Sequence, residues 1–455
     1  MHISQPMKMP NSLAAVLVAL LAALAAGSCC CDAAVAIGRV QLTHTGTGGL
    51  TGREALQRMA QRSKARAKRL LRRGASAPLS PGPLADHDDP HTEYLIRFGI
   101  GTPPQAVVLT FDTGSDLTWT QCQPCLSCFD QALPHFALSQ SSTFGHFLCD
   151  SAECQHLPYW SCGGRPWGNG SCVYTYFYAD KSLTNGLLGF DTFTFAGSGA
   201  GRALSVPGQP FGCGFFNSGS FKNNETGIAG FGRGPLSLPS RLKLDNFSHC
   251  FTTHPFNAAG VSKPSSLLLN LPANLYRGAR GAVQTTPLLQ NPRIPTVYYL
   301  SLKGITVGRT RLPVPESVFA LASNGTGGTI IDSGSSVTTV PPQVHRLLKA
   351  EFASQLVKGG GASVDADNDQ CFTVTPGAKL EVPKLVLHFE GATLDLPREN
   401  YIFKFQEAGN TTICLAFLEG EAMTTIGNFQ QQNLHVLYDL ANNKLSFVPA
   451  QCDKL

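Results

Sequence analysis

The 455-residue sequence predicts an all-β protein built from two related halves. Its 46 glycines, 30 prolines and 27 phenylalanines favour many strands and turns over long helices. Alternating apolar and polar residues begin near Tyr94 and fill much of the chain after it. An apolar strand that runs into Asp-Thr-Gly-Ser or Asp-Ser-Gly-Ser also occurs twice, as LTFDTGSDLTW (109–119) and GTIIDSGSSVTTV (328–340).

A second pattern recurs in the same order. TGIAGFGRGPLSL (226–238) follows the first aspartate and TTIGNFQQQNL (424–434) follows the second, and in each, apolar residues run into a glycine and a loop. Two patterns repeated in one order indicate related halves. A cleft between such halves would place Asp112 and Asp332 face to face. Because a single aspartate of this kind is usually a turn residue, it is the pair that points to chemistry.

Local patterns predict the individual elements. Alternation on both sides of a turn at residues 180–185 predicts a long hairpin over 172–195. A cysteine-dense, irregular insertion held by disulfides is expected over 122–172. Further strands are predicted over 297–308 and 435–449, and a helix after two prolines over 341–357.

The N-terminus has the pattern of an exported protein. The run LAAVLVALLAALAA (13–26) is too short to span a bilayer and is typical of a signal-peptide core, so we predict a signal peptide over 1–26. No later stretch is long enough to span a membrane, and the final residues FVPAQCDKL carry neither a retention signal nor a GPI tail. We therefore expect no membrane anchor and a location in the extracellular space (the apoplast), with the vacuole as second choice.

The net charge of +5 is unevenly distributed. Residues 27–85 hold ten Lys or Arg and two acidic residues, a net charge of +8, whereas residues 86–455 hold 24 basic and 28 acidic residues, a net charge of −4. A protein that binds nucleic acid usually carries its basic charge on the folded domain, so we expect no nucleic-acid partner.

The basic segment from about residue 39 to 73, with the run RSKARAKRLLRR (62–73), is predicted to form one amphipathic helix. It could be a solvated helix, but the charge contrast favours a basic propeptide over 27–85 that covers an acidic cleft. The Pro-rich residues 76–90 that follow are predicted to be a linker and a processing site.

Cysteine usage agrees with export. Apart from Cys29, Cys30 and Cys31, there are twelve cysteines, an even number, which favours disulfides. The spacing Cys122-x-x-Cys125-x-x-Cys128 also suits zinc, but behind a signal peptide we predict no metal. Five sequons are predicted glycosylation sites: Asn169, Asn224, Asn246, Asn324 and Asn410.

Taken together, the two aspartate motifs, the tyrosine hairpin between them and the apolar-Gly repeats resemble the pepsin-like aspartic proteases. The Cys-rich insertion, the basic pro-segment and TPLLQNPRIPTVYYLSLKGITVG (286–308) are similar to the nepenthesin-like plant branch. The resemblance extends from about Tyr94 to Cys452. It implies a bilobal fold, with two related β-barrel lobes (86–284 and 285–455) flanking a substrate cleft.

The resemblance also implies a function. It is that of a secreted monomeric endopeptidase for peptide or protein substrates, made as a zymogen with its own propeptide, active at acidic pH and needing no cofactor. Asp112 and Asp332 would share one proton, as is known for this class, and activate a water between them. The supporting residues match in pairs: Gly114 and Gly334 would turn the chain, Thr113 and Ser333 would bond across the two loops, and Ser115 and Ser335 would bond the outer carboxylate oxygens.

The hairpin departs from the family. Tyr178 matches the flap tyrosine that closes over substrate, and Trp119 falls where that tyrosine finds its indole partner. The family usually has Tyr-Gly-Asp-Gly-Ser, but here the residues are Tyr178-Ala179-Asp180-Lys181-Ser182. Because glycine permits turn angles that Ala and Lys resist, we expect a stiffer flap tip or a different turn type. The charge of Lys181 suggests a preference for acidic or polar side chains near the scissile bond.

Disulfide pairing is likewise implied only by the resemblance, because sequence alone does not choose among the many pairings. The branch's pattern predicts Cys122–Cys125, Cys128–Cys213, Cys149–Cys172, Cys154–Cys162, Cys250–Cys452 and Cys371–Cys414.

Two other functions stay open. The same branch is similar to plant inhibitors of microbial xylanases, which keep the fold, lose catalytic residues and bind a glycosidase. The intact aspartates with their glycine and hydroxyl neighbours favour an enzyme instead. A secreted pattern-binding or wall protein would use the cleft only to bind, and its binding would survive loss of both carboxylates. The absence of HExxH and GxSxG gives no support to a metalloprotease or a serine hydrolase.

Overall fold

The computed structural model describes residues 39–44, 52–72 and 93–454, except for 165–167, 179, 197–202, 220, 222–224, 254–263, 271–275, 277–278, 280, 359–360, 366–369, 379 and 408. The predicted signal peptide lies outside the described residues. Residues 36–455 form one compact unit. Within the described part of the chain, no helix is both long enough and apolar enough to cross a membrane.

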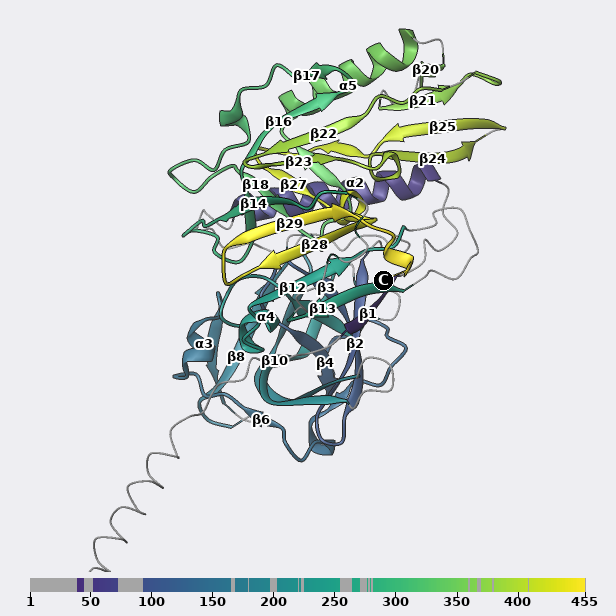
Figure 1. The fold of residues 1–455 in the computed structure, drawn as a ribbon. Coiled ribbons are helices and arrows are strands. Elements are labelled where there is room, and N and C mark those ends of the chain that lie inside the picture. The colour runs from purple at the N-terminus through teal and green to yellow at the C-terminus, as the bar shows by residue number, and fades with distance from the viewer. Residues whose placement is uncertain are drawn as a thin grey trace, which may run out of the picture. The chain divides into compact units, whose positions relative to one another are not determined.

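Most of this unit is β-strand, which confirms the predicted fold class (Figure 1). The first half contains β2 (Tyr94–Ile100), β3 (Gln105–Asp112), β4 (Trp119–Gln123), β5 (Phe136–Ala137), β6 (Gly145–His146), β7 (Trp160–Gly163), β8 (Ser171–Phe177), β9 (Leu183–Phe195), β10 (Leu204–Ser218), β11 (Gly227–Gly230), β12 (Asn246–Cys250) and β13 (Ser265–Leu269), with the short helices α3 (Ala152–Gln155) and α4 (Leu238–Arg241).

The second half contains β14 (Gln284–Leu289), β15 (Tyr298–Leu300), β16 (Leu302–Val307), β17 (Thr310–Arg311), β18 (Thr329–Ile331), β19 (Thr338–Val340), α5 (Pro342–Lys358), β20 (Ala362–Val364), β21 (Cys371–Val374), β22 (Leu385–Phe389), β23 (Ala392–Asp395), β24 (Ile402–Glu407), β25 (Asn410–Leu415), β26 (Phe417–Glu419), β27 (Thr424–Ile426), β28 (Leu434–Asp439) and β29 (Lys444–Pro449). The strands and the helix predicted here from periodicity are therefore present. The predicted boundary at residue 285 falls inside β14.

The sequence repeat becomes a structural repeat. In the first half, β3 lies parallel to β11, which pairs antiparallel with β4, and β4 lies parallel to β10. In the second half, β18 lies parallel to β27, which pairs antiparallel with β19, and β19 lies parallel to β26. Because β3 ends at Asp112 and β18 ends just before Asp332, the two units put one aspartate each at the end of an equivalent strand.

The two halves are joined through one continuous run of strands. β12 of the first half pairs with β28 of the second, and β29 pairs with β14. On the other side, β1 (Arg39–His44) lies between β2 and β13. The N-terminal segment therefore contributes a strand to the sheet that connects the halves.

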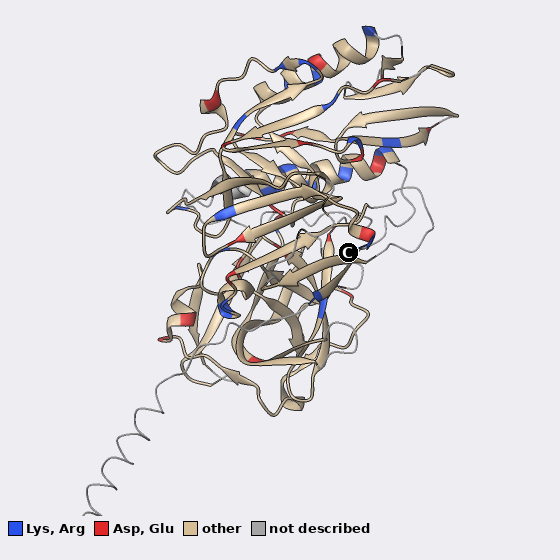
Figure 2. Cartoon of the chain, in the orientation of Figure 1, with Lys and Arg blue, Asp and Glu red and all other residues tan. Residues whose placement is uncertain are grey.

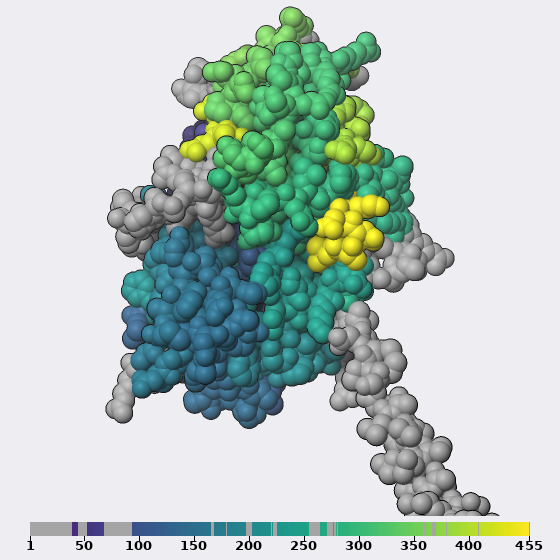
Figure 3. All heavy atoms as spheres, turned by 90° about the vertical axis from the view of Figure 1, so that its left-hand side faces the viewer, coloured from purple at the N-terminus to yellow at the C-terminus, as the bar shows by residue number. Residues whose placement is uncertain are grey.

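The N-terminal segment also contains the helix α2 (Gly52–Arg72), which runs between the two halves and is purple in Figure 1. Ala55, Leu56 and Met59 on one face pack against aromatic residues of the second half, among them Phe403 and Phe405. On the face shown in Figure 3, little of this segment is visible between the blue and green halves. The apolar face thus holds α2 on the second half.

The prediction of a single helix from about residue 39 was wrong at its start. Residues 39–44 form β1, in which Val40 and Leu42 are buried while Arg39, Gln41 and Thr43 are exposed. This alternation has the period of a strand, and only the residues from Gly52 onward have the period of a helix.

The hairpin turn also differs from the prediction: it spans 178–182, because residues 183–185 already pair with β8.

The disulfides match the prediction for Cys250–Cys452 and Cys371–Cys414, and the other four predicted pairs were wrong. Because β4 and β10 are neighbours, Cys122 bonds Cys213, which leaves Cys125 to bond Cys128 across its own loop. In the insertion, the fully buried Cys154 and Cys172 bond each other, and Cys149 bonds the exposed Cys162.

Candidate active site

Asp112 and Asp332 lie in two equivalent loops. The Ser115 hydroxyl donates to Asp112 Oδ2 (2.5 Å), and the Gly114 amide donates to Asp112 Oδ1 (3.0 Å). In the second loop, Ser335 and Gly334 make the same bonds to Asp332, at 2.7 and 3.0 Å. Both carboxylates are 1% or less exposed. Each is therefore fixed by a hydroxyl on one oxygen and an amide on the other, and the serine contacts are those that the family resemblance implies.

The two loops also hold each other. The Thr113 amide donates to Ser333 Oγ (3.0 Å), and the Ser333 amide donates to Thr113 Oγ1 (2.9 Å). The Ser333 hydroxyl in turn donates to the Phe111 carbonyl (2.9 Å). These reciprocal bonds connect residues 220 positions apart and set the distance between the two aspartates.

The two glycines are needed for a different reason from the predicted one. Neither Gly114 nor Gly334 has a positive φ. A Cβ at Gly114 would lie 2.7 Å from Asp332 Oδ1, and a Cβ at Gly334 would collide with Asp112 Oδ1. Glycine therefore makes room for the carboxylate of the opposite half, and the two carboxylates face each other across the loops.

Arg66 of α2 lies on both aspartates. Its Nη2 donates to Asp112 Oδ1 (2.5 Å) and to Asp332 Oδ1 (3.0 Å), and its Nε donates to Asp332 Oδ2 (2.5 Å). The guanidinium occupies the space in which a catalytic water and a substrate carbonyl would have to lie. The charge distribution along the sequence predicted a basic segment over an acidic cleft, but no local pattern distinguished Arg66 from the other basic residues of that segment.

The charges of this group are strongly coupled. Burial raises the pKa of Asp332 above its ordinary value and the charge of Asp112 raises it further, while Arg66 lowers it. Burial lowers the pKa of Arg66, but the two carboxylates raise it by more, so the guanidinium stays charged. As long as Arg66 is bound, its charge compensates the buried carboxylates.

The hairpin residues lie where the resemblance implies. Tyr178 is buried, and its hydroxyl accepts a hydrogen bond from the Trp119 indole (2.7 Å). Burial raises the pKa of Tyr178 well above its ordinary value, so its hydroxyl stays neutral. Asp180 accepts bonds from the Ser182 amide and hydroxyl, whereas Lys181 is exposed and has a φ of 76°. Lysine thus adopts the left-handed conformation for which the family uses glycine; Ala179 lies outside the described residues.

Beside Asp112 is a pocket that forms part of the predicted acidic cleft and contains carboxylates that the sequence did not predict, those of Glu93 and Glu225. It is lined by two cations, Arg62 and Arg66, by the carboxylates of Glu93, Asp112, Asp180 and Glu225, and by Ser63, Thr110, Tyr178, Phe221, Ile228, Gly334, Ser335 and Ser336. Glu93 is 5% and Glu225 is 4% exposed. Figure 2 marks basic positions along α2, from which both cations come. The spacing of Arg62 and Arg66, one helical turn apart in the basic run, could have indicated that both face the cleft. No sequence pattern marked Glu93 or Glu225 as part of the site.

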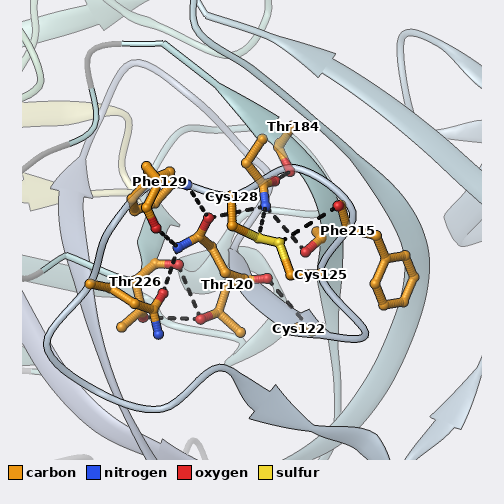
Figure 4. The surroundings of a disulfide bond; sticks show 12 residues. Thr120, Cys122, Cys125, Cys128, Phe129, Thr184, Phe215 and Thr226 are labelled. Carbon is orange, nitrogen blue, oxygen red and sulfur yellow. Dashed lines mark hydrogen bonds between the residues drawn. A yellow bond between two sulfur atoms is a disulfide. The ribbon is translucent and has the colours of Figure 1, made fainter.

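The cysteines with metal-like spacing form a disulfide instead. Cys125 and Cys128 are joined, and Cys125 Sγ lies 3.9 Å from the Phe215 carbonyl oxygen (Figure 4). His135 lies close to both sulfurs. Because the sulfurs are bonded to each other, this group does not offer the thiolates that a zinc site needs.

Of the predicted glycosylation sites, Asn169, Asn324 and Asn410 are exposed, Asn246 is partly buried in β12, and Asn224 lies outside the described residues.

Comparisons with known proteins agree with this geometry. Residues 94–262 match the family model described as xylanase inhibitor N-terminal, and residues 297–449 match the one described as xylanase inhibitor C-terminal. Aspartic proteinase nepenthesin-1 of Nepenthes gracilis is 41% identical over 424 residues, covering 91% of this chain and 90% of that protein. The chain belongs to the nepenthesin-like branch of the pepsin-like aspartic proteases.

A second protease relative and a solved structure add to this comparison. Aspartic proteinase nepenthesin-2 of Nepenthes gracilis is 38% identical over 418 residues, covering 91% of this chain and 90% of that protein. The crystal structure of basic 7S globulin from soybean matches with a TM-score of 0.64 at 18% identity, covering 91% of this chain and 97% of that one. This last likeness shows a shared fold. Family membership and the paired aspartates together identify an aspartic-type endopeptidase.

Proposed function

We propose that this aspartic endopeptidase is secreted as a zymogen and is active at acidic pH, with residues 27–85 as its propeptide. The observation that carries the proposal is that the Arg66 guanidinium forms ion pairs with both Asp112 and Asp332. A cation in that place excludes the water and the peptide carbonyl, so the bound segment is incompatible with turnover.

Once Arg66 leaves, the two aspartates can work as a pair. Two facing carboxylates cannot both ionise cheaply, so one keeps a proton and the other stays charged. The charged carboxylate takes a proton from a water, which attacks the peptide carbonyl, while the protonated carboxyl donates to the carbonyl oxygen. In the resulting tetrahedral intermediate, the carboxyl that took the proton from water gives it to the departing nitrogen, and one hydroxyl returns its proton to the other carboxylate as the C–N bond breaks. Both products are then formed and the pair again holds one proton. The serine and glycine donors hold both carboxylates in place throughout.

Acid favours release of the segment by linkage. In the closed state burial raises the pKa of Asp332, whereas the charge of Arg66 lowers it. Once Arg66 has left, the two facing carboxylates have no cation between them and hold one shared proton. The open state therefore binds more protons than the closed state, and falling pH shifts the equilibrium toward the open state. Arg66 itself stays charged over this range, since its pKa is raised.

A non-catalytic binding protein is the second candidate. It is favoured by the family models that match this chain, which are named for xylanase inhibitors. Against it stand two complete aspartate loops with reciprocal bonds between Thr113 and Ser333, an arrangement that binding a glycosidase does not require.

We also propose that the enzyme acts as a monomer in the extracellular space, the vacuole being the alternative, and that processing occurs in the linker 76–90.

The test is a pH series of proteolysis on a denatured protein substrate. The purified full chain is compared with Asp112→Asn, each with and without pepstatin, an inhibitor of aspartic proteases. Cleavage restricted to acidic pH and abolished by both the substitution and the inhibitor is the expected result. No cleavage at any pH, with the N-terminal segment verified as removed, would leave the glycosidase-binding function as the better account.

A further inference from the structure

The two strands of the flap hairpin are supported unequally by the strands beside them. On one side, β9 pairs with β10 as far as Leu183, next to the flap tip. On the other side, β8 pairs with β7 as far as Tyr174, and one further hydrogen bond runs from the Thr175 amide to the Tyr159 carbonyl (3.0 Å). In the described pairing, the backbone support of β8 therefore ends before Tyr178, the residue that closes over substrate.

The side chain of Tyr159 reaches further along β8 than its backbone does. Its ring lies edge-on against that of Phe177, with the ring centroids 5.5 Å apart and an angle of 86° between the planes. Phe177 directly precedes Tyr178, and successive side chains of a strand point to opposite faces. Tyr178 faces the core, where the Trp119 indole donates to its hydroxyl. The end of β8 is therefore contacted on both faces, by Trp119 on the inside and by Tyr159 on the outside.

The insertion that carries Tyr159 is fixed to the same hairpin by covalent bonds. The disulfide Cys149–Cys162 ties β7 to the loop before it, and Cys154–Cys172 ties α3 to the start of β8. The contact of Tyr159 thus comes from an anchored strand. Because this residue is 57% exposed, it contributes little to the core and can be replaced without unfolding the chain.

We propose that Tyr159 is a positioning residue of the flap, which limits the outward movement of the end of β8 through Phe177 and so keeps Tyr178 over the substrate. It contacts the outer face of the hairpin and acts only through Phe177. This inference rests on the endopeptidase activity and goes beyond the proposed secretion and activation.

The kinetic consequence follows from how a flap acts. A flap that is held less firmly spends a smaller fraction of its time closed over the cleft, and the apparent affinity for substrate falls by that fraction. The two aspartates and their hydroxyl and amide donors are unchanged, so the proton transfers of the bound substrate are unchanged as well. Loss of the contact should therefore raise KM and affect kcat little.

The test compares Tyr159→Ala with the unaltered enzyme after acid treatment and removal of the N-terminal segment. The substrate is a synthetic peptide that spans one cleavage site found in a denatured protein. We expect KM to rise about 3- to 10-fold, the effect of losing one aromatic pair. We expect kcat to stay within about twofold. A merely structural defect would reduce the number of active molecules, which lowers kcat and leaves KM unchanged.

Two further variants serve as controls. Tyr159→Phe keeps the ring that contacts Phe177 and should keep the KM of the unaltered enzyme. Leu148→Ala removes another exposed apolar side chain of the same insertion, 51% exposed, and should also leave KM unchanged.

Hydrogen exchange measures the flap without using activity. The Tyr178 amide donates to the Ser182 carbonyl (2.8 Å), and the Lys181 amide donates to the Tyr178 carbonyl (3.2 Å). In Tyr159→Ala these amides should exchange faster, because the tip opens more often, while those of β28 in the second half should keep their rates.

An unchanged KM in Tyr159→Ala would overturn the inference, as would equal rises in Tyr159→Phe or Leu148→Ala. Either result would leave the proposed function intact. If the unaltered chain cleaved neither the peptide nor a denatured protein at any pH, the proposed function would fail instead. The exchange rates would then decide the inference, and equal rates at Tyr178 and Lys181 with and without the Tyr159 ring would overturn it.

Discussion

The two halves of the molecule present nearly identical aspartate loops but hold the N-terminal segment in different ways. The second half contacts α2 mainly through apolar packing, in which Leu56 and Met59 lie against Phe403 and Phe405. It also bonds Arg53 at the start of the helix, through Asp365 and Glu407, each at 2.7 Å, and its Asp332 bonds Arg66.

The first half contacts α2 mainly through charge. Glu93 bonds Arg62, and Asp112 shares Arg66 with Asp332 of the other half. Protonation of carboxylates weakens these contacts, whereas apolar packing does not depend on pH. On the proposed function, we expect acid to free the aspartates from Arg66 before the helix loses its apolar contacts with the second half.

The largest expected effect tests whether the two aspartate loops are equivalent in function. Asp112→Asn and Asp332→Asn should each lower kcat on a peptide substrate by at least about a thousand-fold, because each removes one member of the acid–base pair. Asp130→Asn, an exposed aspartate of the first half, should leave kcat unchanged. If either Asp112→Asn or Asp332→Asn kept full activity, the two aspartate loops would not be equivalent in function.

The second prediction concerns the apolar contact with the second half. Leu56 is 1% exposed, so Leu56→Ala should weaken the hold on α2 by about 2–5 kcal/mol. The segment should then dissociate faster at neutral as well as at acidic pH, which gel analysis after brief proteolysis can measure. The exposed neighbour Gln57 provides the control, and Gln57→Ala should leave the rate unchanged. An effect of Leu56→Ala confined to acidic pH would contradict the division between apolar and ionic contacts.

The smallest effect is expected at the flap, a feature of the first half. Lys181 has a φ of 76°, a conformation that costs a side-chain-bearing residue about 1–2 kcal/mol. Glycine removes this cost, but because it has more conformational freedom in the unfolded chain, it also loses more entropy on folding, which offsets part of the gain in stability. Lys181→Gly should therefore raise the unfolding free energy by about 0.5–1 kcal/mol, measured by urea denaturation.

Asn443→Gly is the matched control for the flap, since Asn443 has a φ of 51° and asparagine tolerates that conformation. Its gain should be smaller than that of Lys181→Gly, and a larger gain would refute the strain argument. The cleavage-site profile of Lys181→Gly also decides whether this lysine influences specificity; an unchanged profile would exclude it.

The sequence allowed the duplicated β-fold, both aspartates and their neighbours to be predicted, because each depends on short patterns that occur twice. The Tyr178–Trp119 contact was also predictable, because both residues occupy family positions. The disulfides of the insertion were not, because their pairing depends on which strands are neighbours and which cysteines face inward. Cys122 lies close to Cys125 in sequence, yet the pairing of β4 with β10 brings it to Cys213.

The sequence predicted that a basic segment covers the active site, but it did not predict which residues make the contacts. Charge counts along the chain indicated a basic segment over an acidic cleft. Which arginine reaches the aspartates depends on the register of α2 against partners 46 and 266 residues away, which no local pattern encodes. Glu93 precedes the first strand as an ordinary acidic residue, and only the fold buries it beside Arg62.

The most direct test of the account measures how the onset of activity in the intact chain depends on pH, comparing Arg66→Gln with Arg58→Gln. Both substitutions remove one positive charge from α2, but only Arg66 contacts the aspartates. A buried ion pair of this kind contributes about 3–5 kcal/mol when one partner is removed. The account predicts that the midpoint of activation moves up by at least about one pH unit in Arg66→Gln, which corresponds to about 1.4 kcal/mol, and stays unchanged in Arg58→Gln. Equal midpoints for Arg66→Gln and the unaltered chain would contradict the claim that Arg66 keeps the two aspartates inactive.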